Sequence, residues 1–470
     1  MNLWKTHYNR KLPWCRWGEF CRLDAIAIIA AFVFCFLTMY YADVTVTARF
    51  SFTFLDSLFD GKPISFYANA LATGIAPEGA VYDIGMYVAF AVWNIPVWIL
   101  NKLFQIDLLS IGCLLWYKLM LVFIMFVSIN IMKKIGEVIG YDDTTLKLVS
   151  IIYLLSFTVF FPVLVAVQYD IIPLTFILYG LLCYLRGDKR KFILCFALSM
   201  TMKPFALFAF IALVLMTEKK IRKIILYNFC GVSLMLCCKI LYSFSKGYRA
   251  SGGDFFSGML PVLFANSIPV GNAELSLFIF ALFLIYIAAY DWKAGMDPQE
   301  NTGRIILIVT FVWAAFSVFV GIPPYWLVYL SPFLTLSLFM NPGKVNFCLI
   351  LDWIYNSTIT VIMIMQYPWV YGGGKTFQYL LFKPFYLNYM EGKEGVTVAG
   401  ILRRLYIEDL LPIFSAVQAA AILAILFMAW RKNDEERQKV GIWHVRVRVC
   451  MLYGWIALSL GAFALGILGY

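Results

Sequence analysis

Residues 186–223 read RGDKRKFILCFALSMTMKPFALFAFIALVLMTEKKIRK, an apolar run with a basic cluster at each end and Lys203-Pro204 at its middle. A single membrane-spanning helix here would put one of the two basic clusters outside, against the cytoplasmic preference of Lys and Arg. A mid-membrane lysine also costs about 2.5–3.5 kcal/mol on insertion scales, and proline removes a helical hydrogen bond. Two half-helices that enter and leave on one side, with Lys203-Pro204 at a tip lining a wet cavity, reduce these costs. We therefore predict a broken hairpin; a kinked single span with an exposed basic loop is the alternative.

The composition of the whole chain excludes a set of ordinary soluble domains. Of its 470 residues, 62% are hydrophobic and only 14% are charged, against about 25% charged in soluble domains. The chain is therefore predicted to be an all-α polytopic membrane protein forming a single integral membrane domain over residues 1–470. Its net charge of +11 is interpreted through the positive-inside rule, and no nucleic-acid partner is predicted. The first apolar run is expected to be a retained helix and not a cleaved signal peptide.

The basic clusters also set the predicted topology. If the basic clusters after residue 109 are cytoplasmic, a single membrane crossing by the run at 85–104 would put them on the wrong side of the membrane. This run contains Trp93, Asn94, Pro96 and Trp98, which suit an interfacial or re-entrant element. We then count about eleven full transmembrane helices, with the N-terminus cytoplasmic and the C-terminus outside. The predicted exterior segments are 43–109, the turn at 168–170, 246–273, the turn at Pro323-Pro324, and 367–410.

Polar residues at membrane depth mark a pathway, a site or a turn. Asp43 directly follows the first span, where it is either functional or a helix-end carboxylate without a role. Gln168-Tyr169-Asp170 interrupts a long apolar stretch, either as a pocket or as a tight exterior turn. Lys118 lies inside the run at 110–132 and either snorkels or faces the cavity. Arg404, beside Arg403 before the span at 411–430, either binds a ligand or meets anionic headgroups.

No pattern in the chain predicts a metal or cofactor. The eleven cysteines form no CxxC pair or Cys/His cluster, so we predict no metal site and no disulfide framework. Gly372-Gly373-Gly374 lacks the GK[ST] of a phosphate loop, so no nucleotide site is assigned. The two histidines, His7 and His444, lie near the chain ends. A catalytic base in the membrane body must then be another residue type.

Four features in order resemble the GT-C superfamily of polyprenyl-phosphate-sugar-dependent glycosyltransferases. They are Asp43 opening a long exterior loop, Gln168-Tyr169-Asp170 after a proline-containing span, Lys203 after a short span and basic turn, and the late turn Pro323-Pro324-Tyr325-Trp326. The resemblance covers roughly residues 24–340, a GT-C-like core with its exterior loop at 43–109. Residues 341–470 lie outside the resemblance and are predicted to form C-terminal helices with an exterior loop at 367–410. The family often has two adjacent acidic residues in the first loop, whereas this chain has only Asp43 there.

The resemblance implies an inverting transfer of a sugar from a polyprenyl-phosphate donor to a cell-envelope glycan or glycolipid, at the outer face of a bacterial inner (plasma) membrane. Such chemistry needs a base on the acceptor hydroxyl and cations on the leaving phosphate. Asp43 is the candidate base, and Lys203, helped by Lys118 or Arg404, is the candidate phosphate clamp. Gln168, Tyr169 and Asp170 would line the sugar or acceptor pocket.

Two other functions compete with the transferase. A lipid-linked-sugar flippase without catalytic activity would distribute charge along both halves of a path, whereas polar residues here concentrate on one predicted exterior face. An ion channel would need a pore-lining series of charges, which the sequence lacks. The enzyme is therefore the favoured prediction.

Overall fold

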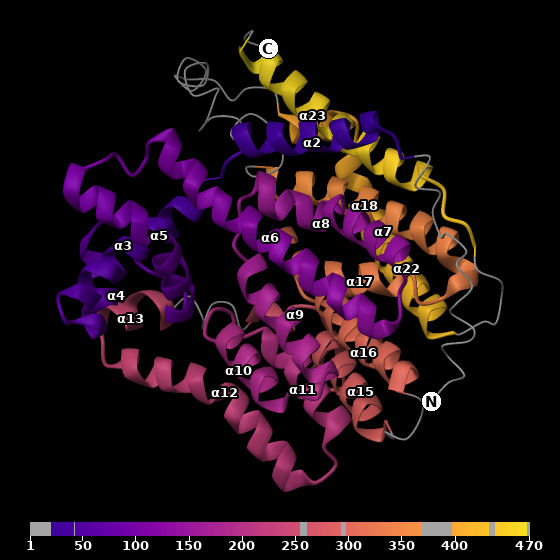
Figure 1. Cartoon of the computed structure of the whole chain (residues 1–470), viewed down its shortest axis with the longest axis horizontal. Coiled ribbons are helices and arrows are strands. Elements are labelled where there is room, and N and C mark those ends of the chain that lie inside the picture. The colour runs from indigo at the N-terminus through magenta and orange to yellow at the C-terminus, as the bar shows by residue number, and fades with distance from the viewer. Residues whose placement is uncertain are drawn as a thin grey trace.

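The computed structural model describes residues 20–41, 43–253, 261–292, 298–368, 397–431 and 438–467. Helices dominate these residues, and the strands found among them form one antiparallel hairpin, β1 (Ser267–Val270) with β2 (Ala273–Ser276), in which Ser267 faces Ser276. Figure 1 shows a large helical bundle with a smaller lobe at one side. The predicted all-α polytopic architecture is confirmed at this level.

The bundle contains most of the long apolar helices. Seven helices of the described chain are long and apolar enough to cross a membrane, or nine if each of two bent helix pairs forms one span. The first half of the bundle consists of α2 (Arg22–Thr38), α6 (Ile111–Ile139), α7 (Asp143–Leu154), α8 (Phe157–Phe160), η3 (Phe161–Val165), α9 (Ile171–Leu185), α10 (Lys189–Met200), α11 (Ala206–Thr217) and α12 (Ile221–Ser243). The second half consists of α15 (Leu277–Asp291), α16 (Pro298–Phe319), η5 (Pro324–Tyr329), α17 (Ser331–Ser337), η6 (Pro342–Lys344), α18 (Val345–Gln366), α21 (Val398–Arg404), η8 (Ile407–Leu410), α22 (Leu411–Trp430) and α23 (Trp443–Ile467).

The predicted count of eleven full spans is not confirmed, because several apolar runs form short helices. α9 and α15 have 15 residues each and α17 has seven. At 1.5 Å per residue, a 15-residue helix covers only about 22 Å of a hydrocarbon core that is about 30 Å thick. α9 begins directly after Asp170, which is buried inside the protein. This helix therefore starts at an internal polar site and not at the membrane surface.

The broken hairpin predicted around Lys203-Pro204 is present. α10 and α11 have 12 residues each and are separated by residues 201–205. Lys189 Nζ, at the start of α10, lies 2.8 Å from Glu218 Oε1, just after the end of α11. The outer ends of both half-helices therefore lie at the same face, which excludes the kinked single span.

The segment predicted as the exterior loop 43–109 folds into the lobe of Figure 1. The lobe has its own apolar cluster, which includes Phe50, Phe66, Tyr67, Tyr87 and Tyr248. It consists of α3 (Asp43–Phe59), η2 (Pro63–Ser65), α4 (Phe66–Ala72), α5 (Ile84–Phe104), α13 (Lys246–Tyr248) and η4 (Arg249–Gly253). The lobe therefore packs as a unit beside the bundle.

α5 corresponds to the run at 85–104 and is one unbroken helix of 21 residues, long and apolar enough to cross a membrane. It packs on α3 through Asn94 Nδ2, which donates to Ser51 Oγ at 3.0 Å, and Trp98 Nε1, which donates to Asp56 Oδ1 at 2.7 Å. Its other face exposes an apolar stripe at helical spacing: Val88, Val92, Ile95, Ile99 and Leu103. A helix with one packed face and one apolar exposed face can either cross the membrane or lie at its surface, so the predicted interfacial or re-entrant placement stays a prediction.

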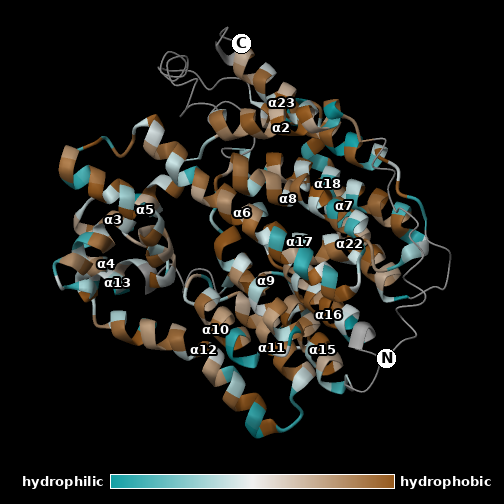
Figure 2. Ribbon diagram, viewed as in Figure 1, coloured by the Kyte–Doolittle hydropathy of each residue, from teal (hydrophilic) through white to brown (hydrophobic). Residues whose placement is uncertain are grey.

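The helix ends that carry basic residues meet at one face of the bundle. α2 and α23 run side by side (Figure 1), and Arg446 binds both carboxylate oxygens of Asp24 at 2.9 and 3.0 Å. Asn341 Nδ2 donates to Arg431 O at 2.7 Å, which joins the start of η6 to the end of α22. In Figure 2 the helix flanks are mostly hydrophobic, as expected for surfaces in contact with lipid.

Candidate functional site

Four polar side chains that are far apart in sequence meet where the lobe joins the bundle. Gln168 Nε2 donates to Asp43 Oδ2 at 2.9 Å. Lys203 Nζ lies 2.6 Å from Asp170 Oδ1, and the Tyr329 hydroxyl donates to the same oxygen at 3.2 Å. We call Asp43, Gln168, Asp170 and Lys203 the polar cluster. It unites most of the predicted site residues.

Local backbone breaks place each member of the polar cluster. The proline-containing turn η3 is a π-helix, and Gln168 N donates to Pro162 O at 2.7 Å as the chain leaves it. Val167 has φ +50°, a conformation that is rare and strained for a β-branched residue. Lys203 lies in the break between α10 and α11, and Asp43 is the first residue of α3. Strain of this kind is common at functional sites because the surrounding structure holds it in place.

Aromatic rings surround the Lys203 ammonium. Its Nζ lies 5.0 Å from the ring centroid of Trp326, 5.6 Å from that of Tyr82 and 5.9 Å from that of Tyr169. A cation at these distances is attracted to the negative faces of the rings. Tyr169 itself is hydrogen-bonded to Thr47, whose Oγ1 donates to the Tyr169 hydroxyl at 3.2 Å. The predicted site residue Tyr169 therefore lies in the same place as the polar cluster.

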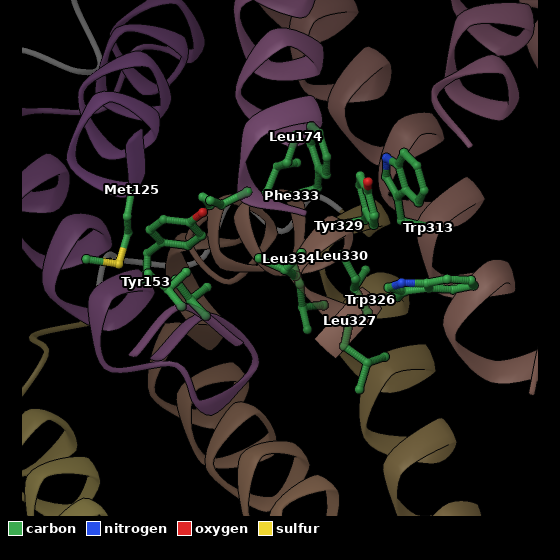
Figure 3. Close-up of a cluster of buried hydrophobic side chains, with 14 of the residues drawn as sticks. Met125, Tyr153, Leu174, Trp313, Trp326, Leu327, Tyr329, Leu330, Phe333 and Leu334 are labelled. Atoms are coloured by element: carbon green, nitrogen blue, oxygen red, sulfur yellow. The ribbon is translucent and has the colours of Figure 1, made fainter. Parts of the chain in front are cut away.

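The turn after Pro323-Pro324 supplies two side chains that we did not predict as site residues. η5 carries Trp326 beside Lys203 and Tyr329 against Asp170. Tyr329 stacks on Trp313 with ring centroids 4.9 Å apart, and the close-up shows Trp326 beside them (Figure 3). The Pro-aromatic motif in the sequence was the signal that could have identified them.

The side chains of the polar cluster differ in how far they are exposed. Asp170 and Gln168 are 0% and 1% exposed, and Asp43 is half-buried. Asp170 Oδ2 is buried without a hydrogen-bond partner among the described residues, an arrangement that is costly in a folded protein and needs an explanation. Gln168 and Asp170 are two residues apart in the chain, which places the hydrogen bond of Asp43 next to the ion pair of Lys203. The cluster therefore combines a half-buried carboxylate with a buried cation.

Half-buried tyrosines form the rim of the cluster. Tyr325 of η5 lies beside Trp326, with ring centroids 6.5 Å apart. Burial raises the pKa of the Tyr82 phenol well above its usual range, and the Asp43 carboxylate adds to this shift. Tyr82 is therefore a neutral hydroxyl at physiological pH. Such a rim offers flat apolar faces together with neutral hydrogen-bonding groups.

A cavity of about 660 Å³ lies on the other side of η5. Pro324 and Leu327 of η5 line it, whereas Trp326 and Tyr329 of the same turn contact the polar cluster. Its polar lining consists of neutral groups: Asn266, Ser317, Gln366, Tyr367, Ser415 and Gln418. Among the described residues this lining carries no charge, which suits an uncharged ligand that is rich in hydroxyl groups.

Lys118 and Arg404 do not join the polar cluster. Lys118 Nζ is fully buried and donates to Cys35 O at 2.7 Å and to Met39 O, at the end of α2. Arg404 is exposed at the end of α21. The predicted loop around Gly372-Gly373-Gly374 lies outside the described residues. The positively charged part of the cluster is therefore Lys203.

The described residues contain no group of three or more His, Cys, Asp or Glu side chains that could hold a metal ion. Comparisons of the chain with family models, with curated proteins and with solved structures gave no match. The function is therefore inferred from the chemistry of the polar cluster.

Proposed function

We propose that this protein is an integral membrane glycosyltransferase that moves a sugar from a polyprenyl-phosphate donor to an acceptor hydroxyl, on the side of the membrane where the lobe lies. One observation carries the proposal. A half-buried carboxylate, Asp43, and a buried cation, Lys203, belong to one polar cluster held together by Gln168 and Asp170. The order and topology of these residues are those that the GT-C resemblance implies.

The proposed reaction is a single displacement at the anomeric carbon. The acceptor oxygen forms a bond to this carbon while the bond from the carbon to the phosphate oxygen breaks. Asp43 takes the acceptor proton, which is general-base catalysis. Polyprenyl phosphate leaves with the bonding electron pair, and the Lys203 ammonium stabilises its negative charge. One displacement inverts the configuration of the sugar.

Asp170 has a supporting role in this proposal. It holds Lys203 in place before the donor arrives, because an unpaired ammonium at this depth would be costly. The donor phosphate then replaces part of this contact. The cavity behind η5, with its neutral polar lining, is proposed to hold the part of the acceptor that lies away from the reacting hydroxyl, while this hydroxyl lies at Asp43. An acceptor made of sugar hydroxyls fits such a lining.

The proposal includes an orientation in a bacterial inner (plasma) membrane. The face that carries Asp24, Arg446 and the outer ends of α10 and α11 would be cytoplasmic, in accordance with the positive-inside rule. The lobe and the half-buried Asp43 would then face the exterior, and the N-terminus would be cytoplasmic. Single cysteines at positions 189 and 220 should both be labelled only from the cytoplasmic side.

The function is tested with purified protein in nanodiscs and a panel of polyprenyl-phosphate sugars with glycan or glycolipid acceptors. We expect consumption of one donor and formation of a glycosylated acceptor with inverted configuration. The Asp43→Asn variant is the matched control because it keeps the shape of the side chain. Movement of the lipid-linked sugar between leaflets without its consumption would overturn the proposal in favour of a flippase.

A further inference from the structure

A second candidate site lies at the opposite end of the hairpin from Lys203. A crevice of about 190 Å³ opens between the outer ends of α9, α10, α11 and α12. Its walls are mainly apolar and are formed by Tyr184, Phe192, Ile193, Val214 and Tyr227. The crevice therefore offers a place for hydrocarbon at the basic face of the bundle.

The mouth of the crevice is strongly basic. Eight exposed cations lie on these helix ends and turns: Arg186, Lys189, Arg190, Lys191, Lys219, Lys220, Arg222 and Lys223. The two acidic residues in the same segments are already paired, Asp188 with Lys191 at 3.0 Å and Glu218 with Lys189 at 2.8 Å. Lys223 Nζ lies 3.9 Å from the second oxygen of Glu218. The net charge around the crevice is therefore clearly positive.

Five of these cations have no ion pair among the described residues: Arg186, Arg190, Lys219, Lys220 and Arg222. Lys219 instead donates to backbone carbonyl groups. Arg190 and Arg222 lie in the first turns of α10 and α12, next in sequence to Lys189, which lines the crevice, and to Lys223, which lies near the crevice residue Glu218. Guanidinium groups at these helix starts are long enough to turn towards the mouth, where they can bind phosphate oxygens in pairs.

The surroundings of the crevice are suited to lipid. On the flanking helices, Leu194 is 54% exposed and Ile225 is 62% exposed. A soluble anion would gain nothing from an apolar crevice, whereas a phospholipid would place acyl carbons there and its phosphate at the basic mouth. Basic pockets between helices at the cytoplasmic side of membrane proteins bind anionic headgroups in this way.

We infer that this crevice binds an anionic glycerophospholipid, with its phosphate held by Arg190 and Arg222 and part of one acyl chain between Ile193 and Tyr227. The site is distinct from the polar cluster at Lys203 and does not depend on the proposed transferase reaction. Its contacts would fix the outer ends of the hairpin against α12.

The test measures lipid binding to the full-length protein in detergent by native mass spectrometry, with phosphatidylglycerol, phosphatidylcholine and inorganic phosphate as probes. We expect phosphatidylglycerol to bind more tightly than phosphatidylcholine. The double variant Arg190→Gln/Arg222→Gln should weaken phosphatidylglycerol binding by about 25-fold, since each basic residue near an anionic headgroup contributes about five-fold. Ile193→Trp, which fills the crevice, should weaken binding without changing the charge.

The matched control is Lys134→Gln/Lys147→Gln, which removes two exposed cations from a different basic segment. We expect this variant to bind phosphatidylglycerol as the parent does. If the control lost phosphatidylglycerol binding equally, the effect would come from the overall positive charge and not from the crevice, and the inference would be overturned. Equal binding of the two lipids, full retention in Ile193→Trp, or competition by millimolar inorganic phosphate would also overturn it.

Discussion

Two buried ion pairs lie in different halves of the molecule, and they differ in what surrounds them. Lys203 pairs with Asp170 beside a half-buried carboxylate, a tyrosine rim and, across η5, a cavity. Arg448 of α23 pairs with Asp352 of α18, and its guanidinium also donates to His444 O at 2.6 Å and Leu349 O at 3.2 Å. The Lys203 pair belongs to a cluster with a further carboxylate, Asp43, whereas the Arg448 pair joins two helices.

The comparison shows that burial of charge does not by itself identify a functional site. A buried ion pair often contributes little net stability compared with apolar residues of similar size, but removal of one partner is strongly destabilising. We expect both pairs to follow this rule. Each pair has one buried polar atom without a hydrogen-bond partner among the described residues, Asp170 Oδ2 and Arg448 Nε. What distinguishes the Lys203 pair is the half-buried Asp43 carboxylate in the same cluster. Variants of both pairs can therefore separate function from stability.

The largest expected effect is at Asp43. Asp43→Asn should reduce turnover by about 10²- to 10⁴-fold, because the amide cannot take the acceptor proton. Donor binding and thermal stability should stay near those of the parent, since the Asn oxygen still accepts from Gln168. Steady-state assays with donor-binding titrations check this. Turnover at near the parent rate would mean that Asp43 is not the base, and Asp170 would become the next candidate.

The next effect concerns stability at the Arg448 pair. Asp352→Leu leaves the Arg448 guanidinium buried without its carboxylate, so the free energy of unfolding should fall by about 3–5 kcal/mol. Addition of Arg448→Met should restore most of this loss. Denaturation of the single and double variants in the same detergent measures both steps. A double variant that remains as unstable as the single one would contradict the pairing.

A smaller effect is expected at Lys118, which the structure links to the end of α2. Lys118→Met removes the ammonium that donates to the carbonyl groups of Cys35 and Met39, although Cys35 O keeps its bond from Met39 N. The free energy of unfolding should fall by about 1–3 kcal/mol. Turnover should fall moderately, because these carbonyls precede Asp43 by only a few residues. Donor affinity separates the two roles considered for Lys118: if its ammonium binds the phosphate, the dissociation constant will rise in parallel.

The smallest effect is expected at Arg404. Its side chain is exposed, so Arg404→Gln should change the free energy of unfolding by less than about 0.5 kcal/mol. Donor affinity in nanodiscs measures its role as a phosphate helper. A large loss of affinity would bring Arg404 into the site and would weaken the assignment of Lys203 as the main cation.

The sequence was most informative where a polar residue interrupts an apolar run. Asp43, Gln168, Asp170 and Lys203 each do so, and the structure brings them together. The basic clusters on both sides of residues 192–216 predicted the hairpin, because a single span would have put one of them outside. Membrane insertion penalises such positions strongly, so a sequence retains them only with a partner or a role.

Features that depend on three-dimensional pairing could not be predicted in this way. In the sequence, Arg448 stands among other basic residues and looks like part of a cytoplasmic cluster, but it lies within α23, which starts at Trp443, and pairs with the buried Asp352. The apolar run of the short helix α9 resembles a full span, because the sequence alone does not show that Asp170, just before the helix, is buried inside the protein. Local composition reports hydrophobicity, whereas the length of a span depends on where its ends lie.

The most direct test of the account compares two charge-free double variants, Lys203→Met/Asp170→Leu and Arg448→Met/Asp352→Leu. Each replaces a complete buried ion pair, so both should remain folded. The measurement is sugar transfer from the polyprenyl-phosphate donor per folded protein in nanodiscs. We predict that the first variant neither binds the donor nor transfers sugar, while the second works at near the parent rate. Transfer by the first variant at near the parent rate would contradict the account.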